Sequence, residues 1–129
     1  MTQTARDVLL QWIDRVGRAD PDAVLELYAE HATLLPTFSP HALASTQAIS
    51  AYFHQLATRS NLQVELHGGS VREMQVGEYM FVLTGVYSFR FDVDEDNLTF
   101  PSRFTFVIDV SSARPILHHH SSQVPRTLS

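Results

Sequence analysis

The sequence predicts an α+β fold in which three N-terminal helices cover a strongly bent antiparallel or mixed sheet. Apolar residues recur at helical spacing in roughly the first half of the chain, whereas from Leu62 onward they follow the two-residue period of strands. Helices followed by strands, without alternation, are typical of α+β folds rather than of βαβ units. The 129 residues are the usual size of one domain, so we expect a single domain over residues 1–129.

Start signals mark each expected helix. Thr4 opens a capping box for a first helix that should reach about Arg18. Pro21 fits the first position of a short second helix, which we expect to include Tyr28. Ser45 is the expected N-cap of a third helix, whose buried face would be Ile49, Tyr52, Phe53 and Leu56.

The second half reads as strands separated by turns rich in Gly, Asp, Ser and Pro. The expected strands are Leu62 to His67, Val71 to Val76, Tyr79 to Phe91, Leu98 to Val110 and Ile116 to Ser122. The long strands are apolar on both faces, and three helices can cover only one face of such a sheet. We therefore expect a homodimer through the outer sheet face, involving Phe104, Phe106 and His119.

Composition narrows the function classes. The chain has nine Lys and Arg against fourteen Asp and Glu, and without a basic stripe we expect no nucleic-acid partner. The absence of cysteine excludes disulfides, thiolate metal sites and a catalytic thiol. The start, Met1 to Arg6, lacks the apolar stretch of a signal peptide, and no apolar run approaches the ~18 residues of a membrane span. We therefore expect a cytoplasmic protein with no membrane partner.

The segment His118 to Ser122, HHHSS, is the most unusual in the chain. If it forms a regular strand, Ile116, His118, His120 and Ser122 share one face, whereas His119 and Ser121 share the other. Only two of the three histidines could then reach one site, and a metal needs three or more converging ligands. Sequence spacing enforces no third ligand, so we expect neither a metal nor a cofactor. The histidines could also be tolerated polar residues on an exposed strand.

Four further polar residues could line a site. Thr37 follows Pro36 at a strand end, where its hydroxyl could point into a cleft or belong to an ordinary turn. Tyr52 could be a core tyrosine whose hydroxyl reaches a backbone group. Arg103, with Thr105 two residues later, could face the covered side with an anionic partner or extend into water from an edge.

Motifs along the chain carry a family resemblance. Three helices, a bent sheet and a final His-x-Ser strand resemble the NTF2/SnoaL-like cone fold. The segments LLPT, AYF, SRFTFVID and LHHHSSQVP are similar to those of the iota-class carbonic anhydrases. The same order of elements resembles the association domain of calcium/calmodulin-dependent kinase, a distant relative. The resemblance extends from about Val8 to Pro125.

The resemblance to the iota class implies reversible hydration of CO₂ to bicarbonate in the cone pocket, and we expect this reaction to be metal-free. The catalytic residues it implies are Thr37, Tyr52, His120 and Ser122. Thr37, Tyr52 and Ser122 would hold the oxygens, and neutral His120 would accept the proton of water. If strand parity is reversed, Ser121 replaces Ser122. We expect Arg103, Thr105, Tyr87, His118 and Ser121 to contact the substrate.

Two alternatives to a carbonic anhydrase remain open. One is a non-catalytic module of the NTF2-like type that binds a small ligand or forms oligomers, and it could keep Arg103 and His120 without an ordered water. The other is a SnoaL-like isomerase or cyclase, which needs a buried carboxylic acid as base. Apart from Asp109, few acids lie in the expected strand interiors.

Overall fold

The computed structural model describes residues 3–125, and its helices begin where the capping signals indicate. Helix α1 (Ala5–Gly17) follows Thr4, which forms a reciprocal capping box with Asp7. Helix α2 (Pro21–Leu25) is capped by the side chain of Asp20, and α3 (Thr46–Leu56) by that of Ser45. The expected three helices are therefore confirmed.

The second helix is shorter than the sequence suggests. It ends at Leu25, and Tyr28 instead begins the strand β1 (Tyr28–Leu35). The expectation that Tyr28 lies on a helix was wrong. The backbone leaves the helix after one turn and pairs with the last strand, so tertiary pairing outweighs the local helical spacing.

Six strands form one sheet in the order β1-β6-β5-β4-β2, with β3 also paired to β4. The remaining strands are β2 (Gln63–Leu66), β3 (Arg72–Gln75), β4 (Met80–Val93), β5 (Asp96–Asp109) and β6 (Ile116–Gln123). β1 runs parallel to β6, whereas all other pairs are antiparallel. The sheet is therefore mixed, and the α+β class predicted from the sequence is confirmed.

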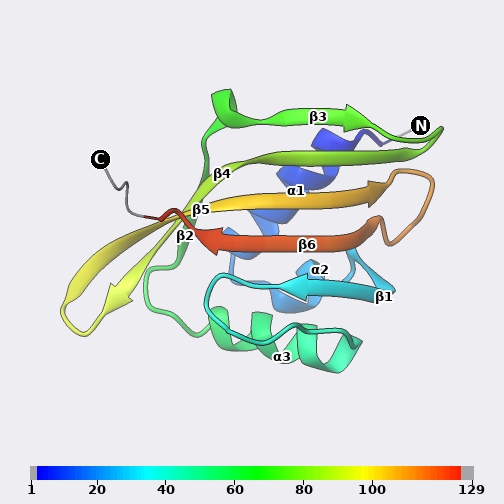
Figure 1. Cartoon of the computed structure of the whole chain (residues 1–129). Coiled ribbons are helices and arrows are strands. Elements are labelled where there is room, and N and C mark those ends of the chain that lie inside the picture. Colours follow the sequence, from blue (N-terminus) through cyan, green and yellow to red (C-terminus); the bar gives the residue numbers. More distant parts are fainter. Residues whose placement is uncertain (1–2, 126–129) are drawn as a thin grey trace.

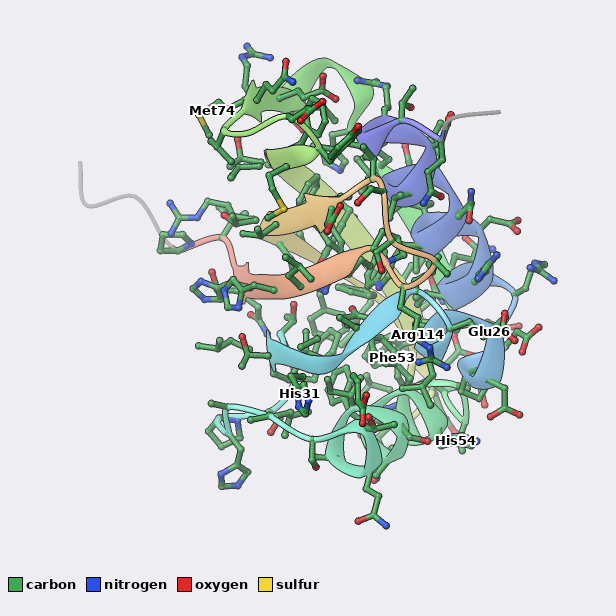
Figure 2. The ribbon with its side chains drawn as sticks, turned by 90° about the vertical axis from the view of Figure 1, so that its right-hand side faces the viewer. Glu26, His31, Phe53, His54, Met74 and Arg114 are labelled. Atoms are coloured by element: carbon green, nitrogen blue, oxygen red, sulfur yellow. The ribbon has the colours of Figure 1, made fainter. Side chains whose placement is uncertain are left out.

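The long hairpin of β4 and β5 gives the sheet its bend. β3 pairs with the first half of β4 and β2 with the second half, and the 3-10 turn η1 (Gly68–Ser70) lies between these two short strands. In Figure 1 the helices lie on one side of the sheet and below it, whereas the face toward the viewer carries no helix. Figure 2 shows Phe53 between α3 and the sheet, and Met74 on the side away from α1. We call the face of the sheet toward the helices the inner face, and the opposite face, which carries no helix, the outer face.

A bulge in β6 decides which side chains face inward. Ile116 pairs with Ile108, but the next pair joins His118 to Val107, so β6 has one extra residue, Leu117, at this point. An extra residue reverses the alternation of every later side chain in the strand. His119 and Ser121 are therefore buried on the inner face, whereas His120 is exposed.

The core lies between the inner face and the helices, and Trp12 is at its centre. The indole of Trp12 stacks on Tyr87 at 5.0 Å between ring centroids and contacts the edge of His119 at 5.1 Å. Phe106 stacks on His119 at 3.8 Å. Among the apolar residues in and next to the three helices, four are buried, namely Trp12, Leu27, Phe53 and Leu56, whereas Ile13 is half-buried.

The outer face differs from the expectation for a dimer interface. Phe104, Phe106 and His119 are 3 %, 0 % and 1 % exposed, because all three point into the core. These residues therefore cannot form the outer surface. In the part of the chain described, no helix is long and apolar enough to cross a membrane.

Candidate functional site

The inner face of the sheet encloses a cavity of about 10 Å³. One wall is polar and consists of Thr37, Tyr52, Tyr87, His119 and Ser121. The other walls are apolar or aromatic and consist of Trp12, Leu34, Pro36, Phe53, Leu56 and Phe89. No residue of the lining carries a formal charge at neutral pH. A space of this size holds about one water molecule or one small polar group.

Hydrogen bonds connect the polar wall to the core on the side of β1. The indole Nε1–H of Trp12 donates to the hydroxyl of Tyr28 at 3.0 Å. The same hydroxyl lies 2.7 Å from Nδ1 of His119. Nε2 of His119 lies 2.9 Å from the hydroxyl of Tyr87, so the imidazole bridges β1 and β4.

The chain of hydrogen bonds continues from Tyr87 to the cavity. The hydroxyl of Tyr87 donates to Oγ of Ser121 at 2.7 Å. Ser121 is hydrogen-bonded to Oγ1 of Thr37, which donates in turn to Oγ of Ser102 at 3.2 Å. Seven side chains from α1, β1, β4, β5, β6 and the segment after β1 thus form one connected network.

Burial determines the protonation states of this network. It lowers the pKa of His119 well below its usual value, and the neighbouring His118 and His120 lower it further. The imidazole is therefore neutral at physiological pH. Burial also raises the pKa values of Tyr28 and Tyr87, so both phenols keep their protons.

Tyr52 lies between the inner cavity and the surface. Burial raises its pKa to about 12, and a hydrogen bond from the backbone of Phe38 partly offsets the effect. Tyr52 and Leu56 line both the cavity and a surface groove of about 370 Å³ between α3 and the segment after β1, which also contains Arg59. The groove therefore adjoins the cavity, with the side chains of Tyr52 and Leu56 between the two spaces.

Four of the residues expected in the site line the inner cavity: Thr37, Tyr52, Tyr87 and Ser121. The inward orientation assigned to His120 and Ser122 was wrong, because the bulge at Leu117 turns both to the outer face. Ser121, the alternative to Ser122, is the serine that faces inward.

The other expected residues lie together on the outer face. Arg103, Thr105, His120 and Ser122 line a shallow hollow of about 420 Å³ there. Arg103 lies opposite Ser122 and Thr105 opposite His120 in the β5–β6 ladder. His118 is also outside the cavity, with Nδ1 2.6 Å from Oγ1 of Thr33. The sheet separates these side chains from the cavity, so none of them reaches a ligand there.

Sequence reasoning missed four members of the network as site residues: Trp12, Tyr28, Ser102 and His119. For Trp12, the partner of its indole N–H was not anticipated from the sequence. A signal was available for Ser102, which alternates in phase with Phe104 and Phe106 and is fully buried. A buried serine within an apolar strand face needs a polar partner, which indicates a polar interior.

No group of three or more His, Asp or Glu residues that could hold a metal ion occurs within residues 3–125. The three consecutive histidines are divided between the two faces of the sheet. His119 has both ring nitrogens engaged by tyrosine hydroxyls.

Solved structures share this architecture. A protein from Xanthomonas campestris, assigned to the calcium/calmodulin dependent protein kinase II association domain, is 28 % identical with a TM-score of 0.83, over 97 % of this chain and 91 % of that one. SalBIII, an epoxide hydrolase/cyclase-like enzyme of pyran ring formation in salinomycin, is 15 % identical with a TM-score of 0.74, over 92 % and 89 %. A SnoaL-like polyketide cyclase from Shewanella denitrificans is 12 % identical with a TM-score of 0.67, over 92 % and 89 %. At 15 % and 12 % identity, the last two similarities show a shared fold and no more.

The comparisons support the NTF2/SnoaL-like fold. A protein from Caulobacter vibrioides with a cystatin-like fold also matches, with a TM-score of 0.76 at 10 % identity over 93 % of this chain and 87 % of that one. No curated protein matches the chain. The family model of the calcium/calmodulin dependent protein kinase II association domain matches residues 2–125, nearly the whole sequence. The chain therefore belongs to the calcium/calmodulin dependent protein kinase II association domain family.

Proposed function

We propose that the chain is a small-ligand-binding member of its family, and that the ligand places a small polar group in the inner cavity. One observation carries this proposal: the polar side chains of Thr37, Tyr52, Tyr87 and Ser121 converge on one cavity whose other walls are apolar. A concave apolar site with a few convergent polar groups is the usual form of a small-molecule site.

Size and access define the ligand. The cavity of about 10 Å³ accepts a group of one or two heavy atoms, whereas the adjoining groove of about 370 Å³ has room for a larger remainder. Because Tyr52 and Leu56 line both spaces, a ligand with a small polar head and a longer body would occupy them together. The uncharged lining favours a neutral head, because a buried charge would have no counter-charge there.

A titration with small probes tests this proposal. Methanol and fluoromethane, each with two heavy atoms, would be added separately to protein labelled with ¹⁵N-histidine, and the His119 resonances followed. We expect saturable shifts with at least one probe in the wild type and in Ser122→Ala, and weakened binding in Ser121→Ala. Shifts confined to His118 and His120, or binding unaffected by Ser121→Ala, would contradict the proposal.

Hydration of CO₂ is the second candidate, and it is favoured by the placement of Thr37, Tyr52 and Ser121. These residues lie in or beside motifs that resemble the iota class, and all three line the cavity. Such a site could hold the attacking water by its hydroxyl groups. Tyr52 and His119 are poor acceptors for the proton of that water, because burial raises the pKa of Tyr52 to about 12, which keeps the phenol protonated, and lowers that of His119, which makes it a weaker base. For this reason we rank binding above catalysis.

An assay separates the two functions. CO₂ hydration would be measured on protein whose metal content is determined in the same sample, before and after exhaustive chelation. A rate that exceeds the buffer rate, survives chelation and falls in Thr37→Val supports metal-free hydration. Loss of activity on chelation, restored by zinc or manganese, would contradict the metal-free mechanism.

The cyclase or isomerase alternative has less support from the cavity. Such chemistry needs a buried carboxylic acid as base, and the residues that line the cavity include no Asp or Glu. Asp109, the acid singled out in the sequence, lies at the end of β5 and accepts hydrogen bonds from the backbone and side chain of Ser111. It is therefore already engaged in a turn.

We propose that a second copy of the chain covers the outer face, through residues other than those first expected. Met74, Val82 and Val107 lie side by side across β3, β4 and β5, and Met74 is 49 % exposed. An uncovered apolar row on a sheet face favours a partner surface. The family, described as an association domain, is consistent with pairing of copies.

A further inference from the structure

The hydrogen-bond chain behind the cavity has a fixed donor at one end. The indole N–H of Trp12 can only donate, and it donates to the hydroxyl oxygen of Tyr28 at 3.0 Å. The proton of Tyr28 then needs another acceptor. Among residues 3–125 the acceptor within hydrogen-bond distance is Nδ1 of His119, at 2.7 Å.

This arrangement determines the tautomer of the imidazole. A neutral imidazole has one donor and one acceptor, so if Nδ1 accepts from Tyr28, the ring proton must be on Nε2. Nε2–H then donates to Tyr87 at 2.9 Å. With the opposite tautomer, Trp12 and His119 would both donate to Tyr28, and the buried proton of Tyr28 would have no acceptor, which is costly.

The donor-to-acceptor direction of the later hydrogen bonds follows from this tautomer. Tyr87 accepts a hydrogen bond from Nε2–H of His119, so it donates its own proton to Ser121 in a hydrogen bond of 2.7 Å. Ser121 donates to Thr37, and Thr37 donates to Ser102 at 3.2 Å. From Tyr28 to Thr37, each hydroxyl thus accepts one hydrogen bond and donates one, and Ser102 accepts the last. Ser121 and Thr37 each keep a lone pair for the cavity.

We propose that the Trp12–Tyr28 pair holds His119 in the Nε2–H tautomer, and that the resulting direction of the chain makes the cavity select a ligand group that donates a hydrogen bond, namely a hydroxyl. The selectivity rests on the proposed ligand-binding function, whereas the tautomer does not. A ligand proton can bind the lone pairs of Ser121 and Thr37 without breaking a bond of the network. A ligand with acceptors alone either leaves these two lone pairs without a donor or forces one of the two hydroxyls to turn out of the chain.

Tyr52 complements this preference on the opposite side. The backbone of Phe38 hydrogen-bonds to its oxygen, so the phenol proton of Tyr52 is left for the oxygen of the ligand. A hydroxyl group satisfies both requirements, because it donates one proton and accepts another. His119 is then a positioning residue that orients Tyr87, and not a proton acceptor facing the cavity.

The tautomer can be measured directly on the ligand-free protein. In long-range ¹H–¹⁵N spectra of ¹⁵N-histidine-labelled protein, the nitrogen without a proton resonates well downfield of the protonated one. We expect Nδ1 of His119 to be the downfield nitrogen, and to move further downfield in Tyr28→Phe, where it loses its donor. A protonated Nδ1 in the wild type, or an Nδ1 resonance unchanged in Tyr28→Phe, would overturn the inference.

Selectivity is tested with methanol, which can donate a hydrogen bond, and with fluoromethane, which has the same number of heavy atoms and cannot. In the wild type methanol should bind more tightly, judged by the His119 shifts. Thr37→Val should weaken methanol binding roughly three- to ten-fold, as expected for one lost hydrogen bond, whereas Thr37→Ser should retain it. Fluoromethane binding as tight as that of methanol would overturn the selectivity. If neither probe binds, the proposed ligand-binding function and its selectivity fail together, and a protonated Nε2 would still support the tautomer.

Discussion

Nδ1 of His119 lies 2.7 Å from the hydroxyl of Tyr28, although the two residues are 91 positions apart in the chain. On the other side of the ring, Nε2 lies 2.9 Å from the hydroxyl of Tyr87. One buried imidazole thus joins β1, β6 and β4 at the back of the cavity. Because the same side chains form the core and the candidate site, changes there affect stability as well as binding.

Truncation of His119 should destabilise the fold far more than truncation of its neighbour. His119→Ala removes a ring stacked on Phe106 at 3.8 Å and leaves two buried phenol groups without their partner. We expect a loss of about 2–5 kcal/mol in the free energy of unfolding. His120→Ala, on the exposed side of the same strand, should change it by less than about 0.5 kcal/mol. Urea denaturation of both variants checks this, and equal losses would show that the parity of β6 is incorrect.

The two adjacent serines offer the same contrast with less disturbance. Ser121→Ala removes the acceptor of the Tyr87 proton, so we expect a loss of about 1–3 kcal/mol in stability. Ser122→Ala on the outer face should have almost no effect on the thermal midpoint. Calorimetry of the pair measures the difference, and a larger loss in Ser122→Ala would argue against the bulge.

Stability should fall in mild acid because of His119. Its pKa is lowered in the folded protein, so the unfolded chain binds a proton more readily once the pH falls below the ordinary value of about 6.5. The free energy of unfolding therefore decreases as the pH falls below about 6.5, with a limiting slope of about 1.4 kcal/mol per pH unit for this one group. His119→Phe, which cannot be protonated, should show a smaller slope between pH 6.5 and 5. Identical slopes would indicate that His119 titrates normally.

Self-association should depend on the outer apolar row. Val107→Glu places a charge between Val82 and His118 on the outer face, and we expect it to convert a dimer to a monomer at micromolar concentration. Leu10→Glu is the matched control, since Leu10 is 47 % exposed on α1 at the opposite side of the molecule. Light scattering gives the masses. A monomeric wild type, or dissociation by the control alone, would contradict the proposed interface.

Local chemistry was enough to predict the elements of the fold from the sequence. The capping residues Thr4 and Ser45 and the change from helical to alternating periodicity are short-range signals, and the structure confirms the helices and strands that they indicate. Tyr28 shows that such short-range signals do not always determine the local structure. Its helical spacing from Val24 is real, yet pairing with Ile116, far along the chain, determines its conformation.

The site was harder to predict because one extra residue controls it. Thr37 and Tyr52 were identified from their motifs, and both line the cavity. For the last strand, regular alternation from Ile116 gives His120 and Ser122, whereas the bulge at Leu117 gives His119 and Ser121. A bulge depends on the register between β5 and β6, which no local pattern in the sequence reveals.

The central claim is that a ligand binds on the inner face of β6, among Thr37, Tyr52 and Ser121. A high-resolution crystal structure of the protein soaked in methanol, or pressurised with CO₂, tests it most directly. The account predicts density for the probe in the inner cavity, within hydrogen-bond distance of Oγ of Ser121 or Oγ1 of Thr37. Probe density confined to the outer hollow beside Arg103, His120 and Ser122, with the inner cavity unchanged, would contradict it.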